Sequence, residues 1–297
     1  MNLLSPGNRL FELARLGQRL PHLVLSPVLS LVFILGAQLT GGVVAVLIIV
    51  ALSLAEGGTL SANNPNQLVA LIMPNNALEQ TILLVLAFGP IFLWLWLWLK
   101  FVEKRPFWTI GLERDRAGLK YLRGMGVGLL MFGGAVAFLA ALGYIDFEQG
   151  GPQKQGLAAL AGVVLVYLGW TVQGPAEEAL TRGWLMPVIG ARYRPWLGVL
   201  ISSIFFAVMH SFNPNLGPIA MLNLFLFGLF AALYSLWERG LWGVFSLHAV
   251  WNWMQGNVLG LEVSGNVAPG GTLLDLKEIG PDVITGGGFG PEGGLAV

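Results

Sequence analysis

Cysteine is absent from this 297-residue chain, and charged side chains are scarce. Without cysteine the chain can form no disulfide, no thiolate zinc site and no cysteine nucleophile. Only 11% of the residues are Asp, Glu, Lys or Arg, whereas soluble domains carry about 25%. The formal net charge is zero, so no overall basic field favours nucleic acid as a partner. The shortage of charge, with 55% hydrophobic residues, predicts a membrane protein.

The N-terminal residues do not have the pattern expected of a clean secretory signal, and no small-residue cleavage site is evident. Residues 1–22 form an amphipathic N-terminal segment with arginines among leucines, and the apolar run after it is too long for a signal peptide. We expect residues 5–20 to form a helix on the cytoplasmic membrane surface. A flexible basic leader fits the same residues equally well.

Seven apolar runs approach the ~20 residues that a membrane-spanning helix needs. They cover 27–54, 79–101, 120–143, 156–190, 196–212, 218–237 and 240–260. The predicted fold class is therefore all-α: a polytopic transmembrane helical bundle of about seven spans within residues 23–260. One span contains Gly124, Gly126 and Gly128, a pattern typical of closely packed membrane helices.

The loop charges indicate the orientation. In the seven-span arrangement, Lys154 and Lys277 alone among the 16 lysines and arginines fall on the side that collects most of the acidic residues. Because cytoplasmic loops are enriched in Lys and Arg, we expect a multi-pass protein of the cell membrane. Its N-terminus lies in the cytoplasm and its C-terminus on the opposite side. Residues 261–297, rich in Gly and Pro, are expected to be a flexible extramembrane tail; a lid over the outer mouth of a site is the alternative.

Six polar residues stand inside the most apolar half of the chain. They are Glu177, Glu178, Arg182, His210, His248 and Asn252. Such groups are costly at membrane depth and usually partner one another around an interior site. Glu178 and Arg182 are four residues apart, as are His248 and Asn252, so each pair shares one helix face.

The run 156–190 is too long for a straight span, because as a helix it would measure about 52 Å against a hydrocarbon core of ~30 Å. We expect a break at Gly174-Pro175, with Pro175 opening a second helix whose N-terminus favours the carboxylates that follow. Counted from the basic turn near 191, Glu177 and His210 both lie about 21 Å deep on antiparallel neighbours. His248 and Asn252 lie about 12 and 18 Å deep, within reach of the same point.

These motifs resemble those of the CPBP family of CaaX prenyl-protease and bacteriocin-processing (Abi) intramembrane proteases. The resemblance rests on Glu177-Glu178-x-x-x-Arg182, Phe206-x-x-x-His210 and His248-x-x-x-Asn252, in that order. The hydrophobic architecture extends it over about 110–260, and Trp108-Thr-Ile-Gly-Leu112 adds a weaker match. It implies hydrolysis of peptide bonds in membrane-anchored proteins or peptides. Nothing in the sequence indicates that the substrate is prenylated.

Hydrolysis of an amide needs an activated water, a stabilised oxyanion and a protonated leaving amine. We assign Glu177 as the general base and His210 as a second holder of the same water. Glu178 and Arg182 would orient neighbours and neutralise charge. His248 and Asn252 would donate to the oxyanion.

Use of a metal is left open by the sequence. Glu177, His210 and His248 could supply a zinc set with an open position, but no HExxH helix is present and Arg182 would oppose a dication. A metal-free glutamate mechanism is preferred. The competing functions are a proton-coupled transporter, for which the first two spans offer few polar residues, and a non-catalytic bacteriocin-immunity or binding protein.

Overall fold

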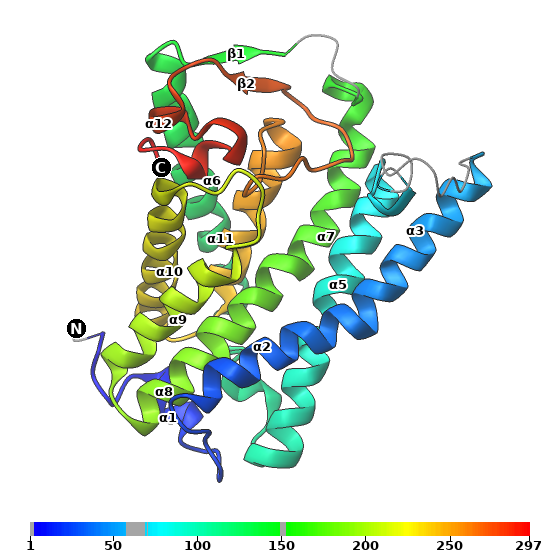
Figure 1. Cartoon of the computed structure of the whole chain (residues 1–297). Helices are drawn as coiled ribbons and strands as arrows, with labels where there is room; N and C mark the ends of the chain where they lie inside the picture. Colours follow the sequence, from blue (N-terminus) through cyan, green and yellow to red (C-terminus); the bar gives the residue numbers. More distant parts are fainter. Residues whose placement is uncertain (1–2, 58–68, 70, 149–152) are drawn as a thin grey trace.

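The chain folds into a bundle of long helices, seen in a computed structural model (Figure 1). The structure describes residues 3–57, 69, 71–148 and 153–297. In the N-terminal half the elements are α1 (Arg9–Ala14), α2 (Leu25–Ala37), the π-turn η1 (Gln38–Gly42), α3 (Val43–Ala55), α5 (Ala77–Trp98), η2 (Leu99–Glu103), η3 (Phe107–Ile110) and α6 (Ala117–Ala141). Strand β1 (Ile145–Phe147) and η4 (Gly156–Ala159) lead into the C-terminal half.

The second half carries the polar residues. It contains α7 (Leu160–Glu178), the π-helical η5 (Ala179–Leu185), α8 (Met186–Arg192), α9 (Pro195–Met209), α10 (Pro218–Glu238), α11 (Trp242–Trp253) and η6 (Met254–Val258). The chain ends with β2 (Leu276–Glu278), α12 (Asp282–Thr285), η7 (Gly287–Phe289) and η8 (Pro291–Gly293).

Helix starts follow local chemistry. Asn76 precedes α5 and accepts a hydrogen bond from the Glu79 backbone N–H at 3.0 Å, while the Glu79 carboxylate accepts from the Asn75 N–H at 2.8 Å. This reciprocal arrangement satisfies two backbone donors that a helix start leaves free. Pro195 and Pro218 open α9 and α10, where a missing N–H costs nothing.

Five helical stretches in the described residues are long and apolar enough to cross a membrane. They are Leu25–Ala55, Ala77–Glu103, Ala117–Ala141, Gly156–Arg192 and Pro218–Glu238. The polytopic helical bundle agrees with the prediction, but the count of seven spans is not reached. Helices also occupy the other two expected positions; α9 is apolar but shorter, and α11 with η6 ends at Val258.

The expected break at Gly174-Pro175 is wrong. α7 continues through Pro175 to Glu178, and η5 and α8 extend the helical path to Arg192. Proline is tolerated within membrane helices where neighbours satisfy the freed backbone groups. The glutamates therefore lie inside a continuous helix and gain no helix N-terminus. The irregularity comes one residue later, in the wide π-turns of η5 that begin at Ala179.

The N-terminal helix is shorter than expected and is docked on the protein. α1 covers Arg9–Ala14, and Leu10, Phe11 and Leu13 are buried. Gly190 of α8 makes room for Phe11, because an added Cβ would lie 2.3 Å from its ring. The apolar face of this amphipathic segment therefore packs on the bundle rather than on lipid.

The C-terminal residues are folded against one end of the bundle (Figure 1). β2 pairs with β1 in a small antiparallel sheet that the all-α prediction lacks. Phe289 is buried among side chains of α9 and α10. Gly286 and Gly290 have φ values of 94° and 86°, a region that glycine enters at little cost. Here glycine serves tight turns, so the expectation of a flexible tail is not met.

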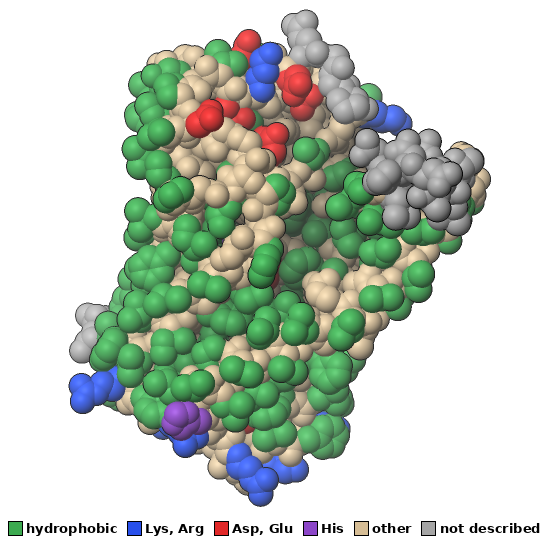
Figure 2. Space-filling view, in the orientation of Figure 1, with side chains coloured by type: hydrophobic (Ala, Val, Ile, Leu, Met, Phe, Trp, Pro, Cys, Tyr) green, Lys and Arg blue, Asp and Glu red, His purple; other side chains and the backbone are tan. Residues whose placement is uncertain are grey.

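Charge separates along the bundle. Figure 2 shows Lys and Arg gathered at the lower end, a broad apolar band above them, and most Asp and Glu at the upper end. α6 and α11 pack closely, because an added Cβ at Gly124 or Gly128 would come within 2.0 or 2.8 Å of α11 carbonyl oxygens. Gly126 has open space instead. The contact holds α11, which carries His248 and Asn252, in the middle of the bundle.

Candidate active site

The two adjacent glutamates of α7 face different surroundings. The Glu177 side chain is 20% exposed, and the Glu178 side chain is fully buried. Consecutive helix residues point about 100° apart, so one carboxylate reaches a cavity and the other reaches the packed interior. Gly174 allows α11 to approach this turn, since an added Cβ would lie 3.1 Å from both the Ala249 nitrogen and the His248 ring.

Glu178 is the centre of a buried charged cluster. Its Oε1 accepts hydrogen bonds from Arg182 Nη1 and from His248 Nδ1, both at 2.9 Å. The Arg182 guanidinium also donates to Thr181 Oγ1 at 2.8 Å and to the Gly228 carbonyl at 3.1 Å. Phe206 covers it, with the guanidinium carbon 4.5 Å from the ring centre. A buried carboxylate needs such partners, because an unpaired charge in the interior is costly.

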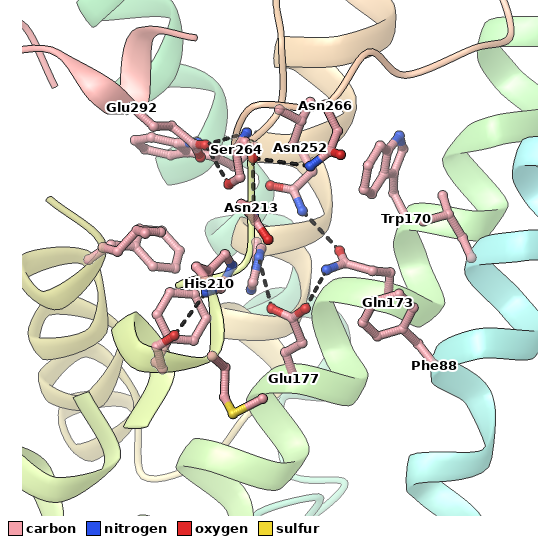
Figure 3. Close-up of a pocket in the computed structure, with 18 of the residues that line it drawn as sticks. Phe88, Trp170, Gln173, Glu177, His210, Asn213, Asn252, Ser264, Asn266 and Glu292 are labelled. Carbon is pink, nitrogen blue, oxygen red and sulfur yellow. Dashed lines mark hydrogen bonds and ion pairs between the residues drawn. The ribbon is translucent and has the colours of Figure 1, made fainter. Parts of the chain in front are cut away.

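Glu177 is oriented by an amide chain. Gln173 Nε2 donates to Glu177 Oε1 at 2.7 Å, and Gln173 Oε1 accepts from Asn252 Nδ2 at 2.9 Å (Figure 3). The second carboxylate oxygen, Oε2, has no hydrogen-bond partner among the described residues and lies 3.9 Å from His248 Nε2. One oxygen is thus tied to the protein, and the other faces an imidazole nitrogen.

The hydrogen-bond partners of the two histidines show which ring nitrogen carries a hydrogen. His210 caps the C-terminus of α9, and its Nδ1 lies 2.8 Å from the Phe206 carbonyl oxygen. A carbonyl only accepts, so this nitrogen carries hydrogen and Nε2 of a neutral ring is an acceptor. The same reasoning applies to His248, whose Nδ1 donates to Glu178. Both Nε2 atoms can therefore take a proton.

These groups meet at the polar end of a cavity of about 900 Å³. Glu177, His210, His248 and Asn252 line it, together with aromatic and aliphatic residues of α5, α9 and α10. The face in Figure 2 is hollowed at mid-height. The site thus combines a small set of polar atoms with a large apolar wall, as ligand cavities commonly do.

Of the six residues expected at the site, Glu178 and Arg182 lie behind the cavity wall rather than on it. Sequence reasoning missed several polar residues of the lining. They include Gln173, Asn213, Ser264, Asn266 and Glu292. Gln173 stands one turn before Glu177 on the same face, a spacing that could have identified it. No local signal places Glu292 in the same cavity as Glu177, more than a hundred residues away.

The zinc set considered from the sequence is not supported. In the part of the chain that the structure describes, no three His, Asp or Glu side chains are grouped as metal ligands. The buried Arg182 beside Glu178 adds a positive charge that would repel a dication. The steps proposed below therefore use only the side chains of this chain.

Comparison with known proteins supplies a family but no close relative. No curated protein and no solved structure matches the chain. Residues 158–254 match a family model described as type II CAAX prenyl endopeptidase Rce1-like, and this range contains all six expected site residues. The family and the apolar helices together indicate a multi-pass membrane protease. The CPBP resemblance is thereby confirmed, since residues 158–254 match the Rce1-like family model.

Proposed function

We propose that this protein is a glutamate-dependent intramembrane endopeptidase in which Glu177 activates a water molecule. The observation that carries the proposal is the pairing of Glu177 Oε2 with His248 Nε2, 3.9 Å apart on the wall of a mainly apolar cavity. A water bound beside this pair, within hydrogen-bond reach of both atoms, could lose a proton to the carboxylate. The Rce1-like domain supports peptide-bond hydrolysis as the reaction.

Gln173 has a positioning role in this scheme. Its amide ties Glu177 Oε1 and leaves Oε2 to take the proton from water. The same side chain accepts one hydrogen of Asn252 Nδ2. The second hydrogen of that nitrogen stays available for a substrate oxygen, because a side-chain amide carries two donors.

The oxyanion would be stabilised by Asn252 and by a protonated His248. The Glu178 carboxylate accepts from His248 Nδ1 and stabilises the imidazolium when Nε2 takes a proton. Arg182 offsets the charge of Glu178 when His248 is neutral. In this assignment Glu178 and Arg182 are positioning residues.

Glu177 accepts a proton from water as the water oxygen bonds to the peptide carbonyl carbon, giving a tetrahedral oxyanion. The carbon–nitrogen bond then breaks, and the departing nitrogen takes a proton. His210 Nε2 takes this proton from Glu177 and passes it to the departing nitrogen, so that Glu177 and His210 both return to their starting states, while the Phe206 carbonyl holds His210 Nδ1.

We infer that the substrate is a membrane-anchored protein or peptide that reaches the cavity from the bilayer. The apolar wall suits a substrate held near the membrane, and the family acts on such proteins. The separation of basic and acidic ends supports a cytoplasmic N-terminus and an outer C-terminus. The same charge separation favours seven crossings of the membrane, in which α9 and α11 are added to the five longer helices.

The test is cleavage of a membrane-anchored peptide by purified protein in liposomes. Glu177→Gln keeps the size of the side chain and removes the base, so turnover should fall by at least about a thousandfold. Glu56→Gln, at an exposed glutamate outside the cavity, is the matched control. Equal turnover by wild type and Glu177→Gln would refute the proposal.

Chelation tests the metal-free character separately. Activity that survives thorough removal of divalent metals agrees with the glutamate mechanism, and loss that zinc restores contradicts it. Peptide-independent proton flux in the same liposomes would instead favour the transporter alternative.

A further inference from the structure

A second cavity, of about 410 Å³, lies at the basic end of the bundle. Five cationic side chains line it, and we call it the basic pocket. They are Arg9, Arg116, Lys120, Arg123 and Arg239. The pocket brings together α1, the start of α6 and the end of α10, and it shares no lining residue with the cavity of the candidate active site.

Acidic residues in the basic pocket neutralise only part of this charge. Glu113 is held by Arg9 through two hydrogen bonds of 3.0 and 2.7 Å. Glu238 is held by Arg123 at 2.5 Å and by the Gly243 N–H at 2.6 Å. Asp115 is the third acid of the lining.

Three cations of the pocket have no ion-pair partner among the described residues: Arg116, Lys120 and Arg239. Lys120, near the start of α6, reaches the turn that follows α10: an added Cβ at Gly240 would lie 3.6 Å from its Nζ. Because five cationic and three acidic side chains line the pocket, it has an excess of positive charge.

The backbone at the pocket adds to this excess. Arg116 and Arg239 have φ values of 50° and 57°, a left-handed conformation that residues with side chains seldom adopt. Their helix-end positions turn both arginines toward one cavity. α6 also begins there with no capping side chain, so its first N–H groups and its dipole favour an anion.

The position of the pocket points to a lipid. Leu119 and Leu122, on the first turns of α6, are 62% and 65% exposed, and Trp237 of α10 is 48% exposed. Exposed leucines suit acyl chains, and tryptophan is enriched at the level of headgroups. Arginine binds phosphate oxygens through a planar fork of N–H donors. Apolar residues thus adjoin the free cations at the boundary of the membrane.

We propose that the basic pocket binds the phosphate group of an anionic phospholipid headgroup. Arg116, Lys120 and Arg239 contact the phosphate, and the acyl chains lie along the exposed face of α6. The Arg9–Glu113 and Arg123–Glu238 pairs shape the walls. This binding is independent of peptide hydrolysis.

The experiment uses the full chain in nanodiscs of phosphatidylcholine with increasing phosphatidylglycerol. Bound lipid is counted by native mass spectrometry, and the unfolding temperature is recorded. We expect saturable retention of phosphatidylglycerol and a rise in unfolding temperature. Each lost cation should weaken retention about fivefold, as expected for about 1 kcal/mol per charge at a membrane surface.

The variants are Lys120→Gln, Arg116→Asn and Arg239→Asn. Asparagine is chosen for the two arginines because it tolerates the left-handed backbone. Lys100→Gln is the matched control, since Lys100 lies at the same basic end of the bundle outside the pocket. Each variant must unfold at the wild-type temperature in phosphatidylcholine alone, so that a folding defect is recognised.

A parallel arm adds inorganic phosphate to phosphatidylcholine nanodiscs. Stabilisation by phosphate alone, equal to that by phosphatidylglycerol, would overturn the lipid as the source. Wild-type retention of phosphatidylglycerol by all three pocket variants would overturn the site itself. Loss in these variants, with retention in Lys100→Gln, is the supporting result.

Discussion

Replacement of Glu178 by glutamine tests whether the buried cluster assists catalysis or only packing. Glu178→Gln keeps an oxygen that can accept from His248 and Arg182, both now at 2.9 Å. It removes the negative charge that would stabilise an imidazolium at His248. Because Glu178 does not line the cavity, binding of the substrate should be little affected.

The magnitude follows from Coulomb's law. Opposite unit charges about 3 Å apart interact by about 5 kcal/mol at an effective dielectric constant of 20. Glutamine retains part of this interaction energy through its hydrogen bond to His248. We therefore expect the transition state to lose about 4 kcal/mol of stabilisation. That corresponds to a kcat lower by about a thousandfold, with KM within about threefold of wild type.

The assay is single-turnover cleavage in liposomes, together with the unfolding temperature. Glu103→Gln is the matched control, because Glu103 forms a second fully buried pair, with Arg105 at 2.6 Å, outside the cavity. It should lower stability and leave kcat near wild type. The double variant Glu178→Gln/Arg182→Met removes both charges and should recover stability without recovering turnover. A folded Glu178→Gln enzyme with full kcat would refute the reasoning.

Three further predictions concern other parts of the molecule. Gln173→Leu should lower kcat by about tenfold to a hundredfold through loss of orientation at Glu177, whereas Gln173→Glu, which would set two carboxylates together, should shift the pH–rate profile. Gly124→Leu should destabilise the fold by at least ~1–3 kcal/mol, while Gly126→Leu, with open space around it, should not; thermal unfolding compares them. Burial raises the pKa of Glu278 to about 7 from its usual 4.5, so its contribution to stability is present below pH 4.5 and lost as pH rises through about 7. Limited proteolysis of the C-terminal residues should therefore become faster across this window in wild type and stay level in Glu278→Gln, and an unchanged wild-type rate would contradict the prediction.

Part of the candidate site followed from helical geometry along the chain. Residues four apart share a face, which pairs Glu178 with Arg182 and His248 with Asn252. The depth count from the basic turns placed Glu177, His210 and His248 within reach of one another, and the structure has all three on one cavity wall. Both arguments use only the rise and period of a helix, and these hold wherever the helix is regular.

The same reasoning failed where the helix or its neighbours departed from the simple case. Pro175 suggested a break, yet α7 runs through it because packed helices satisfy the freed backbone groups. Gly174 serves close approach to His248 instead of a turn. The glycine-rich C-terminal residues suggested flexibility, yet Gly286 and Gly290 form tight turns that bring Glu292 to Ser264, with hydrogen bonds of 3.0 and 2.8 Å.

Composition and period are local properties, so the membrane class, the helical fold and the pairs on one helix face could be read along the chain. The different roles of Glu177 and Glu178 could not, because neighbouring carboxylates look alike until the surrounding helices expose one and bury the other. The Gln173 bridge to Asn252 and the reach of Glu292 to the cavity likewise depend on how distant segments pack. Solvation and hydrogen-bond partners set the chemistry of a polar group, and in this protein both come from helices far apart in the chain.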